Sequence, residues 1–484
     1  MTLNIVQNWQ RSLLVAILFF VVIFSFSNLT TRPKVWFDEG LNVEIAHNFI
    51  LFRKLDILTA PDAFSGAPYI VGTNGYPLTI PLGVVFYIFG FGLTQTRIFM
   101  LVWIIVALLS IYFVVRRFFG IKNALATTAF VATFAPFYGN GLTALGEVPG
   151  FVFLIWGLFF LFEPEQKNYW LTGLFFGLSS VVKPSLYLLL FPSFLIYLFL
   201  EERKEFFKKL FKFGVGAIPP MFLWFILAFP EPFFLKTWQG ALWFYRYPFG
   251  GEFSILDALF RNIKLVFTHS TLIYFLLMTF IIVLWFFING KKDVIQRKWG
   301  VFFFIYGAFA FLYFLKSPGW LRYLLGFELL TFVFLPSALE NISHLFFKTG
   351  RFPKFAFVFA ATFILIIQLV QLFFFRSDFY SDDSQRTVAF IKESLARRPD
   401  YKVGFLNLPE VAGFIEPLKK FHIVKIAGPS PVFGENPLSF SFNSLPRFIS
   451  FSKENDFVKQ YKDVLNSNYF LLKQIGRFSV YELK

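Results

Sequence analysis

Residues 94–120 read TQTRIFMLVWIIVALLSIYFVVRRFFG, and they show which solvent this chain folds in. Between Arg97 and Arg116 they hold eighteen residues without a charged side chain. An α-helix needs roughly 20 apolar residues to cross the hydrocarbon core of a bilayer. The whole chain of 484 residues is 57% hydrophobic and only 15% charged, which is more apolar surface than a soluble protein could cover. The sequence therefore predicts an integral membrane protein.

The distribution of charge narrows the class of protein further. The net charge is +16, but the Lys and Arg residues stand in short clusters between apolar runs. This is the positive-inside pattern of a multi-pass membrane protein, so no nucleic acid is expected as a partner. The chain has no cysteine, which excludes disulfides, thiolate metal sites and a thiol nucleophile.

The apolar runs predict an all-α polytopic membrane protein with about 11 to 13 transmembrane helices. From a cytoplasmic N-terminus, eleven crossings place all four basic clusters on the cytoplasmic side. Those clusters are residues 116–122, 201–212, 289–298 and 344–354. The crossings are residues 12–30, 98–115, 123–141, 150–163, 169–183, 185–200, 213–230, 271–289, 299–316, 320–337 and 355–375.

One apolar segment, PLTIPLGVVFYIFGFGL at residues 77–93, is predicted not to cross. It contains helix-breaking prolines and glycines, and a crossing there would move all four basic clusters outside. We expect a re-entrant or interfacial hairpin on the outer face, where protein covers the freed backbone groups. This topology leaves a first outer loop at residues 31–97 and a long outer loop at 231–270.

The last part of the chain, residues 376–484, has a different composition. Charged residues become frequent, and KVGFLN (402–407) and HIVKIAG (422–428) are typical of short strands. The runs YFLLK and FSVYELK within residues 469–484 have the same character. We predict a small soluble α/β domain on the outer face, after a transmembrane domain at residues 1–375.

Three acidic residues are predicted to lie at the outer face. Asp38 and Glu39 follow the first span within KVWFDEGLNVEIAHNFI (34–50), and Glu147 lies in a short outer loop. Carboxylates gathered there could accept a proton, hold a divalent cation or orient a sugar. Equally, the Asp-Glu pair could cap a helix that begins near Leu41, and Glu147 could be an ordinary loop residue.

Several cations are predicted at the same face. Lys183 stands in an apolar run beside Pro184, and it could bind an anion or snorkel to lipid headgroups. Arg322 lies just inside a span and needs a carboxylate or phosphate partner, and Arg97 begins another span. Tyr323 fits an interfacial aromatic anchor. This set of charges suits a phosphate-bearing donor with an acceptor that needs a base, and equally a helix bundle held by ion pairs.

In their order, these segments resemble the GT-C superfamily of membrane glycosyltransferases, particularly the branch of protein O-mannosyltransferases and the lipid A aminoarabinose transferase. The resemblance covers about residues 12–340. It rests on six segments with similar order and spacing. They are WFDEG with EIAHNF (36–49), GYPLTIPLGVVFYIFG (75–90), the stretch 94–120, TALGEVPGFVFLIWGLFFLF (143–162), GLFFGLSSVVKPSLYLLLFP (173–192) and GWLRYLLGFELL (319–330).

The resemblance implies that residues 1–375 form a catalytic domain that moves a sugar, hexosyl or pentosyl, from a polyprenyl-phosphate donor to a cell-envelope acceptor. The acceptor would be a lipid, a glycan or a protein. The enzyme would lie among the lipids of the plasma membrane, with its active site and C-terminal domain extracytoplasmic. Asp38 would be the general base or would orient the acceptor, Glu39 would support its loop, and Glu147 matches the second outer-loop acid, where relatives often carry Asp.

The resemblance also implies roles for the cations and two tyrosines. Lys183 and Arg322 would hold the donor phosphate, with Arg97 as a weaker member. Tyr76 and Tyr323 would line the substrate loop. The chain lacks the Asp-X-Asp and Trp-Trp-Asp motifs of oligosaccharyltransferases, which argues against that activity. A divalent cation is therefore possible but doubtful, no metal ligand is assigned, and no other cofactor is expected.

Three other functions remain open at this point. A polymerase or ligase of envelope polysaccharide belongs to the same class, but the Asp-Glu pair disfavours it. A transporter or flippase of lipid-linked sugars would be expected to show inverted repeats, and we find none in the sequence. An inactive relative that serves as a scaffold would carry the same charges without needing them.

Overall fold

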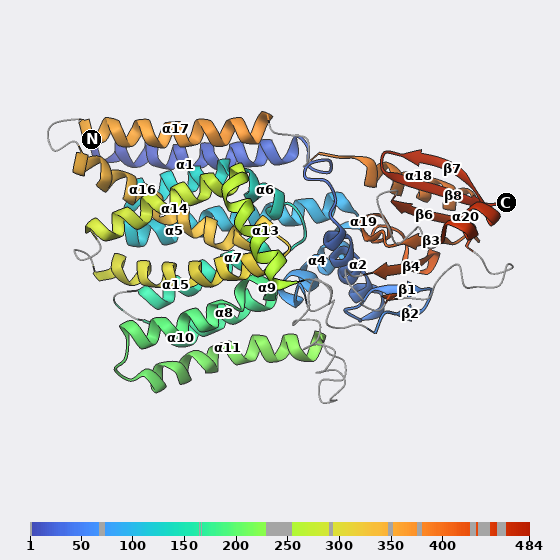
Figure 1. Ribbon diagram of the computed structural model, residues 1–484, viewed down its shortest axis with the longest axis horizontal. Coiled ribbons are helices and arrows are strands. Elements are labelled where there is room, and N and C mark those ends of the chain that lie inside the picture. The colour runs from blue at the N-terminus through green and yellow to red at the C-terminus, as the bar shows by residue number, and fades with distance from the viewer. Residues whose placement is uncertain are drawn as a thin grey trace.

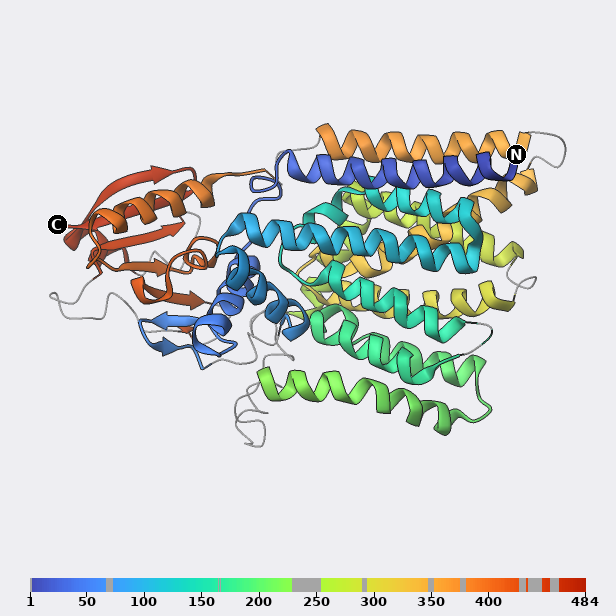
Figure 2. The same ribbon diagram turned by 180° about the vertical axis from the view of Figure 1, so that it is seen from behind.

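The computed structural model describes residues 2–66, 73–163, 165, 167–228, 254–289, 294–346, 352–374, 380–425, 432–433, 446–452 and 461–484. A bundle of roughly parallel and antiparallel helices forms the larger part, and a layer of strands and helices sits against one end of it (Figure 1, Figure 2). We call this end, which carries Asp38, Lys183 and Arg322, the site end. The opposite end, which carries Arg117 and Glu202, is the far end.

The bundle helices are apolar along most of their length, as helices in lipid must be. Eight stretches of the described chain are long and apolar enough to cross a membrane. They lie in α1 (Thr2–Phe26), α5 (Leu93–Thr133), α9 with α10 (Pro184–Tyr187, Leu190–Glu201), α11 (Phe206–Ala228), α14 (Ser270–Asn289), α15 (Val294–Lys316), η1 with α16 (Leu321–Leu324, Leu325–Phe346) and α17 (Phe352–Phe374). Two shorter apolar helices, α7 (Glu147–Phe162) and α8 (Tyr169–Val182), complete the bundle.

Helix α5 is two helices joined by a reversal at Gly120, where φ is +83°. Before that glycine the chain runs toward the far end, where Arg117 pairs with Glu163. After it the chain returns along α16, and the Thr127 hydroxyl donates to the Phe332 carbonyl (3.1 Å). Glycine adopts this backbone conformation without the strain that a side chain would add. The described part of the bundle therefore supplies eleven apolar segments, within the predicted range.

Close packing of small residues joins α8 to α11. A Cβ on Gly173 would overlap the carbonyl oxygen of Phe213, and one on Gly177 would come within 2.9 Å of the Ala217 carbonyl oxygen. Two helix backbones can approach this closely only where side chains are missing. The glycines of GLFFGLSS (173–180) therefore serve the packing of these two helices.

Basic clusters from separate loops meet at the far end. Glu202 accepts hydrogen bonds from Lys209 (2.8 Å) and Lys298 (2.8 Å), and it also pairs with Lys167. Lys122 pairs with Glu340 at 2.7 Å. One end of the bundle is therefore rich in lysine and arginine.

Two helices lie across the site end, α2 (Phe37–Phe52) and α4 (Tyr76–Phe89). The segment 77–93 does not cross the bundle, because Gly75 before α4 donates to the Val181 carbonyl (3.0 Å) and α5 also begins at the site end. The predicted hairpin is wrong in form, since residues 76–89 are one continuous helix. Pro77 falls in the first turn of α4, where its missing N–H costs no hydrogen bond.

The C-terminal elements form a six-stranded sheet in the order β5-β4-β3-β6-β8-β7. Strands β4, β3 and β6 are parallel, and the other pairs are antiparallel. Helix α18 packs on it through Ile391 and Leu395, which join Val403 and Phe405 in one apolar core. The predicted strands near 402–407 and 469–484 are confirmed, and so is the strand predicted at 422–428 as far as residue 425, since residues 426–428 lie outside the described residues. The elements are α18 (Asp383–Arg397), β3 (Val403–Leu406), α19 (Pro409–Ala412), η2 (Pro417–Lys419), β4 (Lys420–Lys425), β5 (Val432–Phe433), β6 (Phe448–Ser452), α20 (Lys462–Asn468), β7 (Tyr469–Ile475) and β8 (Phe478–Leu483).

The remaining described elements are one hairpin and two helices. The hairpin of β1 (Leu58–Ala60) and β2 (Ala63–Phe64) stands beside β4, and α6 (Ala135–Gly141) continues the second half of α5 (Figure 1). Helix α13 (Ile255–Thr268) falls in the predicted outer loop 231–270, of which residues 231–253 lie outside the described residues.

Helix α2 is enclosed between the bundle and the sheet. A Cβ on Gly40 would overlap the carbonyl oxygen of Pro409 in α19, so the two backbones touch. One turn along α2, Glu44 pairs with Lys420 of β4 at 2.8 Å, and both side chains are buried. His422 lies 3.7 Å from the same carboxylate oxygen. Burial alone would raise the pKa of Glu44, but Lys420 and His422 lower it to about 2, so this carboxylate is ionised and ties α2 to the sheet.

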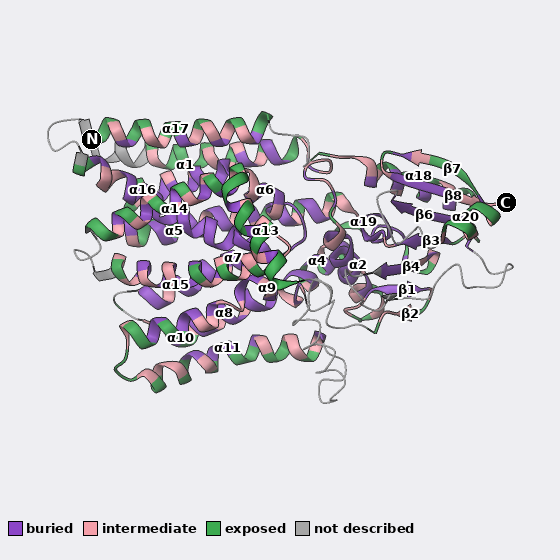
Figure 3. Cartoon of the chain, in the orientation of Figure 1, coloured by how far each residue is buried: buried purple, intermediate pink, exposed green. Residues whose placement is uncertain are grey.

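The surface of the bundle is apolar where lipid would cover it. Figure 3 shows exposed residues along the outer sides of α11 and α17, whereas α7 and α16 are mostly buried. The exposed side chains on those two outer helices include Phe211 (72%) and Phe359 (74%). Soluble proteins seldom expose apolar surface of this extent, and a bilayer removes the cost.

Candidate active site

The site is built where α2, α7, α8 and η1 meet at the site end of the bundle. Asp38 lies in the first turn of α2, and Arg322 lies in η1. The Arg322 guanidinium donates to Asp38 Oδ2 at 2.8 Å. The Asp38 side chain keeps 37% of its surface exposed and that of Arg322 keeps 17%. The pair is therefore held in place and still open to a ligand.

The second part of the site is an ion pair between α7 and the end of α8. Lys183 caps α8, and its Nζ lies 3.6 Å from Glu147 Oε1, at the first residue of α7. Both side chains are buried, Lys183 to 4% exposed, so the lysine does not snorkel to the surface. Lys183 also donates to Asn74 Oδ1 at 3.1 Å. The backbone carbonyl of Glu147 accepts from the Tyr187 hydroxyl (2.6 Å), which fixes the start of α7.

The two ion pairs form one electrostatic cluster. Burial by itself would raise the pKa of Asp38, but the positive charges of Arg322 and Lys183 outweigh it and lower that pKa. Both cations thus act on the same carboxylate, and Asp38 is ionised at neutral pH. The cluster thus holds two basic groups and two acids, of which Asp38 and Arg322 are partly exposed, and such a set can bind an anion and take up a proton.

Glu39 and Arg97 lie behind this cluster. Arg97 donates to Glu39 Oε2 at 2.8 Å and to the Pro33 carbonyl at 3.0 Å, and neither side chain is exposed. Glu39 also accepts from the backbone N–H of Trp36 (3.4 Å), so the capping interpretation applies to this acid. Helix α2 begins at Phe37 and not near Leu41.

The predicted roles stay predictions: Glu39 would support its loop, and Arg97 would be a weaker member of the group that holds the donor phosphate. A fully enclosed pair presents no polar atom to a substrate, so the structure shows them as an ion pair that anchors the first turn of α2 to α5. The sequence could not reveal this, because Arg97 gains its ion-pair partner only when a residue 58 positions away reaches it.

Aromatic residues lie beside the Asp38–Arg322 pair on the η1 side. Arg322 stacks 4.6 Å from the ring centroid of Trp320, which is 46% exposed, and lies 5.7 Å from that of Tyr323. Tyr323 packs edge-on against Tyr313 and is mostly buried. Tyr76 is half-buried at the start of α4. The two tyrosines predicted for the substrate loop therefore stand at the starts of two elements of the site end.

Two buried asparagines belong to this site and were missed by the sequence analysis. Asn74 Nδ2 donates to Asn42 Oδ1 at 3.2 Å, and Asn42 Nδ2 donates to the Ala144 carbonyl at 2.6 Å. Asparagine is common in loops and turns, so a single sequence does not distinguish these from ordinary loop residues.

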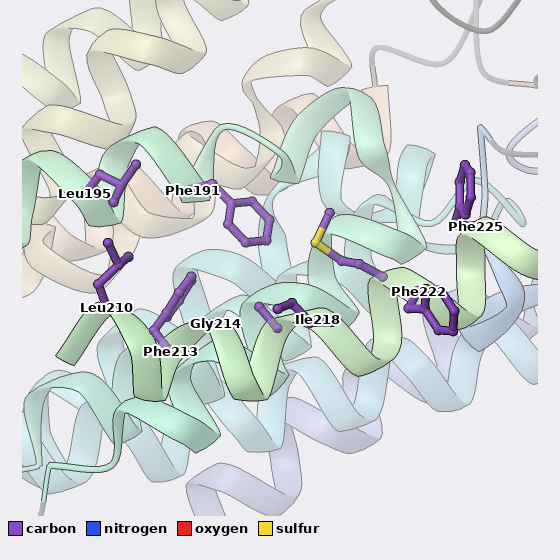
Figure 4. Close-up of a pocket in the computed structure, with 10 residues that line it drawn as sticks. Phe191, Leu195, Leu210, Phe213, Gly214, Ile218, Phe222 and Phe225 are labelled. Carbon is purple, nitrogen blue, oxygen red and sulfur yellow. The ribbon is translucent and has the colours of Figure 1, made fainter. Parts of the chain in front are cut away.

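The described residues include no cluster of three or more His, Asp or Glu side chains arranged to hold a metal ion. Figure 4 shows an apolar pocket of about 470 Å³ between α10 and α11. Its lining includes Phe191, Phe213 and Met221 and no charged side chain. It is separate from the charged site and faces outward along two lipid-exposed helices.

Comparison with known proteins bears on the fold of this chain. The family model for dolichyl-phosphate-mannose-protein mannosyltransferase matches residues 81–227, from α4 to the end of α11. No curated protein matches the sequence.

Solved structures share the architecture of the chain from end to end. ArnT from Cupriavidus metallidurans bound to undecaprenyl phosphate superposes with a TM-score of 0.63 at 13% identity, over 98% of each chain. The apo state of that protein superposes with a TM-score of 0.57 at 12% identity, again over 98% of each chain. The Archaeoglobus fulgidus oligosaccharyltransferase in complex with Zn and sulfate superposes with a TM-score of 0.56 at 12% identity, over 97% of this chain and 73% of that one. The chain therefore has the fold of the GT-C superfamily, and it resembles the branch of the protein mannosyltransferases and ArnT.

Proposed function

We propose that this protein is a glycosyltransferase that moves a sugar from a polyprenyl-phosphate donor to an acceptor of the cell envelope. The observation that carries this proposal is the open Asp38–Arg322 pair, with Lys183 acting on the same carboxylate. Such a transfer needs a base for the acceptor and positive charge for the leaving phosphate, and this cluster holds one acid that can serve as the base and two basic groups. The resemblance to ArnT, whose solved structure holds undecaprenyl phosphate, supports the choice of donor.

In the proposed reaction, the acceptor oxygen attacks the anomeric carbon of the sugar while its proton passes to Asp38. The bond between the anomeric carbon and the phosphate oxygen breaks, and the electron pair leaves with the polyprenyl phosphate. The leaving phosphate thereby gains one negative charge, which Lys183 and Arg322 stabilise. Glu147 keeps Lys183 in place, and Glu39 with Arg97 holds the turn that carries Asp38.

We further propose that the site end faces the extracytoplasmic side of the plasma membrane. Lysine and arginine concentrate at the far end, as the positive-inside rule expects of a cytoplasmic surface. Residues 376–484 would then form an extracytoplasmic domain beside the transmembrane domain of residues 1–375. Its contact with α2 through Gly40 and Glu44 supports this arrangement, because α2 also carries Asp38.

The test uses purified protein in nanodiscs with a panel of radiolabelled polyprenyl-phosphate sugars. Release of polyprenyl phosphate is measured for the wild type, for Asp38→Asn and for Asp463→Asn. The last variant makes the same change in the exposed first turn of α20, far from the site. We expect one donor to turn over with the wild type and with Asp463→Asn, and turnover to fall at least a hundredfold with Asp38→Asn. Equal rates for the wild type and Asp38→Asn would overturn the assignment of the base.

A further inference from the structure

A chain of side-chain hydrogen bonds runs from Lys183 into the protein. The ammonium of Lys183 donates to Asn74 Oδ1 (3.1 Å), and Asn74 Nδ2 donates to Asn42 Oδ1 (3.2 Å). Asn42 Nδ2 then donates to the backbone carbonyl of Ala144 (2.6 Å). Both asparagines are buried, at 1% and 2% exposed. The chain joins the end of α8 to α2 and to the loop before α7.

This chain can run in only one direction. An ammonium group has only donors, and a backbone carbonyl has only acceptors. Asn42 must therefore turn its amide nitrogen to Ala144 and its oxygen to Asn74, and Asn74 must turn its oxygen to Lys183. Each amide is locked in one orientation by the fixed partners at the two ends.

Two glycines leave space for the Asn74 side chain and its backbone. Gly146, at φ +87°, has no Cβ, and one placed there would lie 2.8 Å from Asn74 Oδ1. A Cβ on Gly75 would overlap the Val181 carbonyl oxygen, to which the Gly75 N–H donates at 3.0 Å. Two glycines therefore bring the loop before α4, the loop before α7 and the end of α8 close enough for this contact.

A neutral acceptor at this position has an electrostatic consequence. Lys183 and Arg322 are the basic groups of the cluster, and Asp38 and Glu147 are its acids. Burial raises the pKa of Glu147 and lowers the pKa of Lys183, while the charge of each group favours the charged form of the other. Asn74 accepts a hydrogen bond from the ammonium without adding a further negative charge, and Lys183 Nζ lies 3.6 Å from Glu147 Oε1, longer than a hydrogen bond. The ammonium is thus oriented but incompletely paired.

We propose that Asn74, held by Asn42, is a positioning residue that keeps the Lys183 ammonium ready for an anionic phosphate oxygen of the donor. This inference rests on the proposed function, because it deepens the account of the same site. Asn74 acts through Lys183 and need not touch the sugar. A carboxylate in its place would pair with Lys183 and repel an anion, although it has the same shape.

The experiment compares binding of a short-chain prenyl phosphate with binding of the corresponding prenyl alcohol, to the full chain in detergent. The dissociation constant of the alcohol divided by that of the phosphate measures how much the phosphate group contributes to binding. A lower value of this ratio means a smaller phosphate contribution. We expect Asn74→Asp to lower this ratio at least tenfold with alcohol binding unchanged. Asn48→Asp is the matched control, since Asn48 is equally buried in α2 but donates to the Asp56 carbonyl (2.8 Å) and not to this chain.

Two further variants show whether the effect passes through the lysine. In a Lys183→Met background, Asn42→Leu should have no additional effect on the ratio, because this change adds no charge and acts only through the lysine. Asn42→Leu, which frees the Asn74 amide to rotate, should lower the ratio several-fold and serves if Asn74→Asp does not fold.

The outcomes separate the two proposals. A wild type that binds prenyl phosphate no better than the alcohol would overturn the proposed function and the anion assignment with it. A wild type that prefers the phosphate, with Asn74→Asp and Asn42→Leu showing the same preference, would overturn the positioning role alone. Equal loss of phosphate and alcohol binding in Asn74→Asp would also overturn it, because the amide would then be only structural.

Discussion

Arg322 and Asp38 stand 284 positions apart in the chain and meet at 2.8 Å in the site. One comes from the turn before α16 and the other from the first turn of α2. The arginine is also stacked on Trp320, which limits its freedom to leave. Under the proposed function, the Asp38 carboxylate of the free protein occupies the place where the donor phosphate would bind Arg322.

Replacing Asp38 by Asn should separate binding from turnover. The amide keeps the shape but removes both the base and the anion that pairs with Arg322. We expect sugar transfer to be lost while prenyl phosphate binds as tightly as in the wild type or more tightly. Parallel measurements of turnover and of the dissociation constant check this. Weaker binding of prenyl phosphate by Asp38→Asn would contradict it.

Replacing Arg322 by Met should change the pH dependence of the reaction. The positive charge of Arg322 lowers the pKa of Asp38, so its removal raises that pKa. The acid limb of the pH–rate profile should move to higher pH, and kcat/KM should fall about a hundredfold. Arg322→Lys keeps the charge and should shift the acid limb less. An acid limb that stays in place in Arg322→Met would show that another group sets it.

The buried pair of Glu44 and Lys420 should matter for stability. Glu44→Gln leaves the Lys420 ammonium buried without a charged partner, and we expect a loss of about 3 kcal/mol, seen as a lower Tm. The double change of Glu44→Leu with Lys420→Met removes both charges and should recover most of the loss. A Tm for Glu44→Gln equal to that of the wild type would show that the pair contributes nothing.

The same pair predicts a stability change in acid. The pKa of Glu44 is lowered to about 2 in the folded chain, against 4.5 for an ordinary glutamate. Its contribution is therefore fully present above pH 4.5 and is lost as the pH falls toward 2. The difference in Tm between the wild type and Glu44→Gln should narrow over that interval. A constant difference would contradict this assignment.

Gly40 tests whether contact with the sheet supports the site. A Cβ there would overlap the Pro409 carbonyl oxygen, a backbone atom that cannot move aside alone. Gly40→Ala should therefore displace α2 from α19 and lower kcat, since Asp38 lies two residues away. Gly214→Ala is the control, because a Cβ at Gly214 in α11 meets nothing within 4 Å. The control should be neutral or more stable. Equal activity of the two variants would show that the contact between α2 and α19 does not support the site.

Single cysteines can test the proposed sidedness without background, because the chain has none of its own. Arg397→Cys in α18 and Arg116→Cys at the far end both place a thiol at an exposed position. In intact cells, an impermeant maleimide should label position 397 at once and position 116 only after permeabilisation. The reverse pattern would place the site in the cytoplasm.

The sequence by itself determined the membrane class, the number of apolar segments and the C-terminal strands. These depend on local properties, namely the length of an uncharged run and the alternation that a half-buried strand needs. The sequence also singled out Asp38, Lys183 and Arg322, because charge is rare beside apolar runs and therefore conspicuous. The form of residues 77–93 was less predictable, since a proline in the first turn of a helix and one that breaks a helix look alike.

Only the tertiary structure decided which charge meets which. It enclosed Glu39 with Arg97, left Asp38 with Arg322 open, and brought Asn42 and Asn74 into line behind Lys183. These contacts join segments far apart in the chain, so they depend on how the helices pack and not on local sequence. Asparagine carries no charge that would mark it in a loop, and its importance here comes from two fixed neighbours that orient its amide.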